Sequence, residues 1–139
     1  MTQALEQRTY TPEEYLELEV ASETRNEYRN GAIISMTGGT PDHNDIASNL
    51  VVALKLALRS KPYRVFITDQ RLWIGDRNLY TYPDVMVVEK PLQFKEGRTD
   101  TLVNPCFIAE VFSKSTQDYD RGEKFVAYRT INNFQEYLL

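Results

Sequence analysis

Two acidic residues stand beside apolar segments of the sequence, where a carboxylate is costly to bury. Glu110 is the only charged residue in the run from Cys106 to Phe112, and Asp84 directly precedes the apolar run Val85–Val88. Each carboxylate must be paired, protonated, bound to a metal or placed at an open end of a sheet. If the two runs form neighbouring strands, the carboxylates converge at one sheet edge, where a divalent cation would relieve their repulsion.

Four further residues could take part in chemistry, and each has a simpler interpretation. Lys124 could position water or clamp a phosphate, but its i+4 spacing from Asp120 also suits a solvent-exposed ion pair. Glu27 on its own indicates an ordinary surface charge. His43 could act as an acid or base, although a plain helix N-terminal position is the commoner role. Lys114 is a second basic candidate and is expected to face solvent.

The composition restricts the metal and the class of reaction that these residues could serve. A single histidine and a single cysteine exclude a two-histidine nuclease or zinc hydrolase, a Cys-rich zinc site and an internal disulfide. A metal would be held mainly by carboxylates, which favours Mg²⁺ or Mn²⁺. With 16 basic and 20 acidic residues, the formal charge of −4 argues against non-specific adhesion to nucleic acid, while a local basic face stays open.

The length and the hydropathy pattern predict one globular domain outside the membrane. The chain has 139 residues, of which 42% are apolar and 26% charged, as is ordinary for a single domain. No run approaches the ~20 apolar residues that span a bilayer, and the N-terminus carries no signal-peptide apolar region. We therefore expect a single domain over residues 1–139 of a cytoplasmic protein.

The N-terminal half predicts a helix, a hairpin and a longer helix. Thr11 to Glu14 favours a helix start, because a Thr cap, an early Pro and two first-turn acids coincide there. This helix should end near residues 20–22. Asn30-Gly31 between two strand-like runs predicts a hairpin. A helix from about Pro41 should carry one apolar stripe, formed by Ala47, Val51, Leu54 and Leu58.

The C-terminal half predicts strands, a loop and a last helix. Short strands are expected at residues 63–67 and 71–74, and the two apolar runs suit central strands that are covered on both faces. Residues 90–104 are polar and indicate a loop. A helix is expected over residues 119–130, and another strand should begin at Gln135. This order predicts an α/β (α+β) fold with helices around a mixed central β-sheet.

Several motifs together resemble the Uma family of restriction-endonuclease-like proteins. Each stretch alone is unspecific, but the combination is specific and extends over nearly the whole chain from Tyr10. The matching stretches are Tyr10–Leu16, Asn26–Tyr28 with Gly31, Gly38–Asn44, Tyr82–Val85, Asn104-Pro105, Glu110–Thr116, and Asp120–Phe125 with Tyr128.

The resemblance implies the PD-(D/E)xK nuclease fold, a restriction-endonuclease-like mixed central β-sheet flanked by helices. In that fold an Asp and a Glu on adjacent strands bind Mg²⁺, and a Lys orients or activates the attacking water. The resemblance places Asp84 and Glu110 in the two metal-binding positions and Glu27 as an additional N-terminal acid. The position two after Glu110 is Phe112 rather than Lys, so Lys124 on the following helix is the matching substitute.

Three functional hypotheses stay open at this point. The first is a Mg²⁺- or Mn²⁺-dependent endonuclease that hydrolyses DNA, with Glu27, Asp84, Glu110 and Lys124 as catalytic residues. The second is a non-catalytic DNA- or protein-binding module on the same fold, which the net charge favours. The third is a structural fragment that another chain completes.

The resemblance also implies expectations about assembly and length. Restriction-like nucleases often act as dimers, so a homodimer is expected, with DNA as the partner and no membrane contact. Relatives usually continue past the strand that begins at Gln135. The chain is therefore expected to lack C-terminal strands, which would leave a sheet edge or apolar surface exposed.

Overall fold

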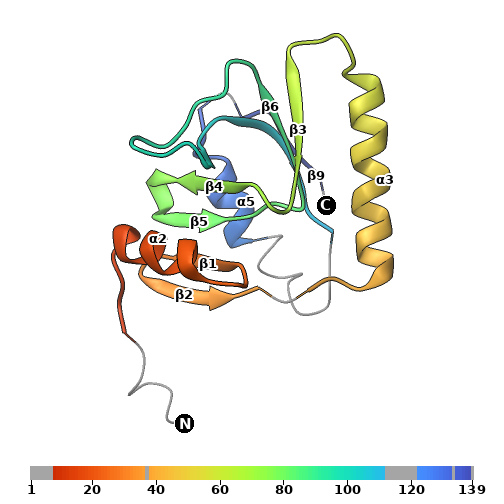
Figure 1. The fold of residues 1–139 in the computed structure, drawn as a ribbon. Helices are drawn as coiled ribbons and strands as arrows, with labels where there is room; N and C mark the ends of the chain where they lie inside the picture. Colours follow the sequence, from red (N-terminus) through yellow and green to blue (C-terminus); the bar gives the residue numbers. More distant parts are fainter. Residues whose placement is uncertain (1–7, 37, 112–121, 133, 139) are drawn as a thin grey trace.

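The computed structural model describes residues 8–36, 38–111, 122–132 and 134–138, in which the strands form two sheets (Figure 1). The five-stranded sheet contains β1 (Asn26–Arg29), β2 (Ala32–Ser35), β4 (Arg71–Ile74), β5 (Leu79–Thr81) and β7 (Thr101–Leu102) in the order β2-β1-β5-β4-β7. The four-stranded sheet contains β3 (Tyr63–Ile67), β6 (Val85–Glu89), β8 (Pro105–Ala109) and β9 (Glu136–Leu138) in the order β3-β6-β8-β9. Both sheets mix parallel and antiparallel pairs.

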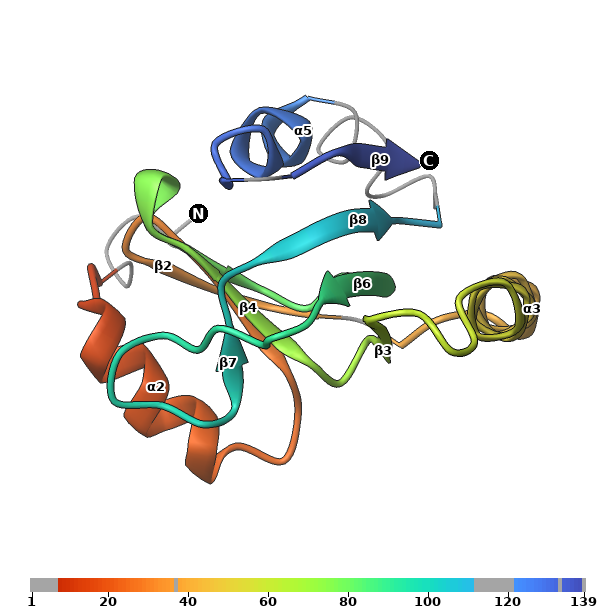
Figure 2. The ribbon, with the colours of Figure 1, turned by 90° about the horizontal axis from the view of Figure 1, so that it is seen from above.

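Three α-helices accompany the sheets in the described residues: α2 (Pro12–Ala21), α3 (Pro41–Ala57) and α5 (Glu123–Tyr128). Figure 2 shows α2 on one side of the five-stranded sheet and α5 on the other, with α3 beside β3. The expected α+β class with helices around mixed sheets is confirmed. The strands are divided between two sheets, and the short strands β5 and β7 are additions to the expected elements. The turn that Gly75 to Asn78 predicts is present as the 3₁₀ turn η1 (Gly75–Arg77).

Local sequence signals account for the first elements. Thr11 accepts a hydrogen bond from the Glu14 backbone, and the Glu14 side chain accepts one from the Thr11 backbone, which together form a capping box for α2. Asn30 and Gly31 have φ values of 47° and 103°, as a tight hairpin turn requires, and they join β1 to β2. Thr40 caps α3 by accepting a hydrogen bond from the His43 backbone.

Two apolar cores fix the five-stranded sheet between its neighbours. Alternate residues of a strand point to opposite faces, so Tyr28 and Tyr80 pack against α2 while Leu72 and Ile74 face the other sheet and α5. The first core is built from aromatic rings, with Tyr15 and Tyr80 stacked at 4.9 Å between ring centroids. The second core holds Leu72, Ile74, Leu79, Met86, Val88, Leu102, Ile108, Ala127 and Tyr128.

The largest differences from the expected elements concern α3 and β8. The apolar stripe of α3 is only half-buried, and Ile46, Val52 and Leu56 are exposed on the rest of that helix. β8 ends at Ala109, so Glu110 follows the strand rather than lying inside it. Phe112 and the expected start of the last helix lie outside the described residues.

No helix in the described ranges has the length and hydropathy needed to cross a bilayer.

Candidate active site

The paired ends of β6 and β8 bring Asp84 and Glu110 together. In this antiparallel pair Val85 lies opposite Ala109, so the next residues outward are Asp84 and Glu110. The Asp84 backbone N–H donates to Glu110 Oε1 over 3.1 Å, and the Val111 backbone N–H donates to Asp84 Oδ2 over 2.8 Å. The main chain of each strand end therefore holds the carboxylate of the other.

Helix α5 supplies a buried ammonium and a phenol to the same place. Lys124 Nζ lies 2.9 Å from Glu110 Oε2, and Tyr128 Oη donates to that same oxygen over 2.7 Å. Lys124, Ala127 and Tyr128 share one helical face by their i, i+3 and i+4 spacing, and all three are buried. Burial and the nearby charge of Glu110 raise the pKa of Tyr128 well above its usual range, so this phenol stays protonated and donates.

Glu27 reaches the site from β1. Because Tyr28 points into the α2 core, Glu27 points to the opposite face, where its Oε2 lies 3.4 Å from Lys124 Nζ. The Thr81 hydroxyl donates to the same carboxylate, and Arg29 donates to it from Nη2 over 2.6 Å. Burial alone would raise the pKa of Glu27, but Lys124, Thr81 and Arg29 together lower it, so Glu27 is ionised.

His43 contacts the opposite side of the acidic pair from Lys124. Its Nε2 lies 3.2 Å from Asp84 Oδ2, and the ring projects from the first turn of α3. The other ring nitrogen, Nδ1, is buried and has no hydrogen-bond partner among the described residues. The sequence left His43 with two interpretations, and this contact places it beside the acidic pair.

Asp84 carries excess negative charge. Burial first, and then the neighbouring Glu110 carboxylate, raise its pKa from 3.8 to about 6, although the Val111 N–H, His43 and Lys124 oppose the rise. Glu110 has Lys124 and Tyr128 as partners, whereas no described residue donates a hydrogen bond to Asp84 Oδ1. Asp84 is also the more exposed of the two acids. Among the described residues, its Oδ1 atom is the carboxylate oxygen of this pair that receives no hydrogen bond.

This raised pKa predicts a pH-dependent stability difference for Asp84→Asn without metal. Since the folded protein binds the Asp84 proton more tightly than the unfolded chain does, wild-type stability is lost as the pH rises from about 4 to about 6. The variant has no such proton to lose. We expect it to gain up to about 3 kcal/mol relative to wild type across this range, at about 1.4 kcal/mol per pKa unit, and no more above it. Urea unfolding in EDTA between about pH 4 and pH 8 measures this difference.

Asp76→Asn is the matched control, because Asp76 lies exposed in η1 and its variant removes the same charge away from the acidic pair. A difference between Asp84→Asn and wild type that does not change with pH would contradict the assigned charge repulsion.

The donor chemistry at Asp84 and Glu110 fits a hard divalent ion. Mg²⁺ is usually held by one or two carboxylates and keeps several of its waters, so it does not need a complete protein cage. Among the described residues, no group of three or more His, Cys, Asp or Glu side chains is arranged to hold a metal. Two oxygen donors with excess negative charge therefore suit Mg²⁺ or Mn²⁺ better than zinc.

The structure brings Glu27, Asp84, Glu110 and Lys124 into one connected cluster. Lys114, the other basic candidate, lies outside the described residues. The sequence reasoning missed three contributors: Tyr128, Arg29 and Thr81. Tyr128 could have been found from its i+4 spacing after Lys124. Arg29 and Thr81 carried no such signal, because their roles depend on which strands pair.

Comparisons with known proteins found one matching family model and two similar proteins from one organism. The model of the Uma2 family, described as "Putative restriction endonuclease", matches residues 12–139. The uncharacterised protein sll1609 of Synechocystis sp. is 40% identical over 93% of this chain and 73% of its own length. A second uncharacterised protein of that organism, slr1290, is 36% identical over 93% of this chain and 67% of its own.

A solved structure agrees with the fold. The crystal structure of a "putative nuclease" belonging to DUF820 from Anabaena variabilis aligns with a TM-score of 0.70 and covers 86% of this chain and 68% of that one. Its sequence identity is 23%, so the likeness concerns the fold alone. The resemblance inferred from the motifs is thus confirmed by a family model that matches residues 12–139: the chain belongs to the Uma2 family.

Proposed function

We propose that this protein is a metal-dependent endonuclease that hydrolyses phosphodiester bonds of DNA. The observation that carries the proposal is the side-by-side placement of Asp84 and Glu110, with a buried Lys124 on Glu110. A carboxylate pair with an adjacent ammonium has the groups that phosphodiester hydrolysis needs, namely metal ligands and a cationic hydrogen-bond donor. The family description of the chain as a restriction endonuclease supports the same reaction class.

In this proposal each residue has a distinct task. A Mg²⁺ or Mn²⁺ ion held by Asp84 and Glu110 would supply charge stabilisation at the phosphate and an acidified water. Lys124 holds the Glu110 carboxylate in place through their 2.9 Å contact, and its ammonium is suited to orient the attacking water because it can only donate hydrogen bonds. Glu27 holds Lys124 in place from the opposite side. His43 Nε2–H donates to Asp84 Oδ2 in this proposal, since an ionised carboxylate can only accept, and this contact orients the carboxylate.

One observation favours the second candidate, a DNA- or protein-binding module without catalysis. Glu110 Oε2 already has two internal partners, Lys124 and Tyr128. A carboxylate neutralised in this way can remain buried without any metal. The two candidates differ in divalent-metal affinity, because the module has no need of a cation at Asp84.

The test is cleavage of supercoiled plasmid DNA. The purified protein should nick or linearise the plasmid with Mg²⁺ or Mn²⁺ and leave it intact with EDTA. Isothermal titration calorimetry with Mn²⁺ should show binding to wild type and its loss in Asp84→Asn. A protein that binds neither ion and leaves varied DNA substrates intact would establish the binding module instead.

Three expectations from the sequence stay predictions. They are a homodimer, a cytoplasmic location and a single domain over residues 1–139. Sedimentation of the purified protein measures the first of these directly.

A further inference from the structure

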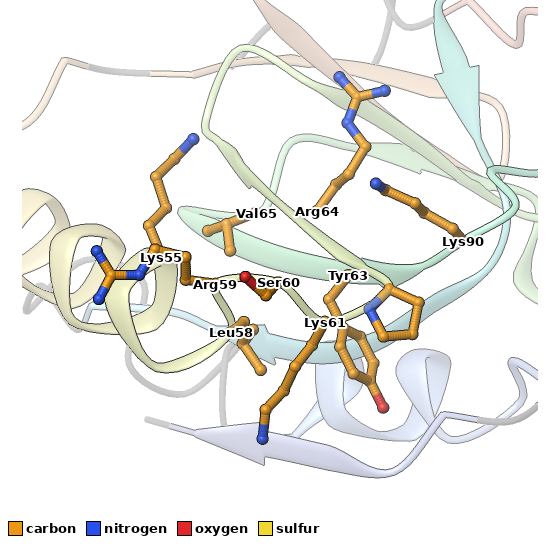
Figure 3. Close-up of a pocket in the computed structure, with 10 residues that line it drawn as sticks. Lys55, Leu58, Arg59, Ser60, Lys61, Tyr63, Arg64, Val65 and Lys90 are labelled. Carbon is orange, nitrogen blue, oxygen red and sulfur yellow. The ribbon is translucent and has the colours of Figure 1, made fainter.

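Five exposed cations surround one open pocket of the protein. The pocket lies where the loop after α3 leads into β3 and where β6 ends (Figure 3). No Asp or Glu is among the described residues that line it. The cations come from three segments of the chain and are Lys55, Arg59, Lys61, Arg64 and Lys90.

These five cations differ from many other basic residues of the protein in their surroundings. Within the described ranges none of them forms a salt bridge, and Arg64 lies over the Phe66 ring, 5.0 Å from its centroid. Other arginines do form salt bridges, namely Arg8, Arg25, Arg29, Arg71 and Arg98. Glu89 precedes Lys90, but no described Asp or Glu lines the pocket itself. In a chain of net charge −4, such a group of like charges repels itself and attracts an anionic ligand.

The shape of this surface favours an extended polyanion over a small anion. The five side chains are all exposed, and Figure 3 shows them pointing in several directions around the β3 ribbon, with Arg64 and Lys61 extending to opposite sides. A single phosphate would need buried donors that converge on one point. A nucleic-acid backbone instead presents regularly spaced charges to dispersed Lys and Arg side chains.

The register of the sheet sets the distance from this surface to the candidate active site. β3 and β6 pair antiparallel from Tyr63 opposite Glu89 to Ile67 opposite Val85. Asp84 precedes one end of β6 and Lys90 follows the other. At about 3.4 Å per residue the two positions are about 20 Å apart, which corresponds to about six phosphates along one strand of a DNA duplex.

We infer that Lys55, Arg59, Lys61, Arg64 and Lys90 bind the sugar–phosphate backbone of duplex DNA, about half a helical turn from the phosphate that is cleaved. The inference rests on the proposed function, since it identifies a second contact of the same substrate. These contacts position the duplex and carry no sequence preference, because every phosphate is alike.

The experiment measures duplex binding against salt concentration. A fluorescein-labelled duplex is titrated in EDTA with Asp84→Asn protein, which keeps the basic surface and cannot cut. The test variant adds Arg59→Gln and Arg64→Gln to this background. Its matched control adds Arg77→Gln and Arg129→Gln, which remove the same charge from positions elsewhere.

The test variant should bind more weakly, and its slope of log affinity against log salt should be shallower by about 1.8, at about 0.9 for each phosphate that is no longer neutralised. The control should keep the slope of its parent. If the test variant fails to fold, the single changes Lys61→Gln and Lys90→Gln provide the same measurement, each with a slope shallower by about 0.9.

Three different results would overturn the inference. Equal slopes for test variant and control would show that this surface does not contact DNA, while the proposed nuclease function stands. A parent protein that fails to bind duplex DNA even at low salt would remove DNA as the substrate, and the inference with it. A test variant that loses binding to single-stranded RNA but not to duplex DNA also counts against it.

Discussion

Asp84→Asn is expected to reduce metal-dependent DNA cleavage by at least about 1,000-fold while the protein stays folded. The change removes a charged oxygen donor at the proposed metal site, and a bound metal ion contributes several kcal/mol to transition-state stabilisation, at about 1.4 kcal/mol for each tenfold in rate. The shape of the side chain is kept, and the Val111 N–H can still donate to the amide oxygen. Initial rates of plasmid nicking with saturating Mg²⁺ measure the effect.

The exposed Asp76→Asn variant controls for the loss of one negative charge and should cut at the wild-type rate. Far-ultraviolet circular dichroism should show the same secondary structure in all three proteins. If Asp84→Asn cut as fast as wild type, the active site would lie elsewhere, whatever the fold.

Lys124→Met should both slow cleavage, by about 100-fold or more, and destabilise the fold by about 3–5 kcal/mol. Glu27 and Glu110 are only 3% and 4% exposed, so removing their shared cation leaves two buried carboxylates that repel each other. The loss of rate has the size expected when a positioned hydrogen-bond donor is removed from a reaction centre. Urea unfolding and plasmid nicking on the same preparation measure both effects.

A second variant separates the catalytic role of Lys124 from its structural one. Adding Glu27→Gln to Lys124→Met removes one of the two carboxylate charges and should recover part of the stability, because the amide can still accept from Thr81 and Arg29. Cleavage should stay low, while Mn²⁺ affinity should persist, since an ammonium is not a metal ligand. Recovery of both stability and cleavage would reduce Lys124 to a structural residue.

The sequence predicts the acidic pair because the signal for it lies within two short, continuous segments of the chain. A charge beside a continuous apolar run is rare, and two such runs favour neighbouring central strands, so Asp84 and Glu110 converge in the structure as expected. Lys124 is different: its spacing suits a solvent-exposed pair equally well, and the family resemblance was needed to choose the catalytic interpretation over that one. Its contact with Glu27 depends on how α5 packs across the sheet, which no local pattern records.

The remaining fold features escape prediction for a similar reason. β5 and β7 are three and two residues long, too short for a period-2 pattern, and they form because neighbouring strands offer unpaired backbone groups. His43 contacts Asp84 because the apolar stripe of α3 lies along β3, next to β6. The separation of the strands into two sheets likewise follows from tertiary packing rather than from any segment's own propensity.

The cluster around Glu110 also determines when, during synthesis, a new chain can form the complete candidate site. Its acids, at positions 27, 84 and 110, leave the ribosome before Lys124, the cation that neutralises two of them. Until α5 has emerged and docked, Glu27 and Glu110 lack that cation, and the contact between Glu27 and Lys124 joins distant parts of the sequence, which form contacts more slowly than near ones do. A nascent chain, or one that terminates before Lys124, would therefore contain the three acidic residues without the cation that orders them. The candidate site would therefore be complete only after Lys124 has been synthesised and α5 has docked.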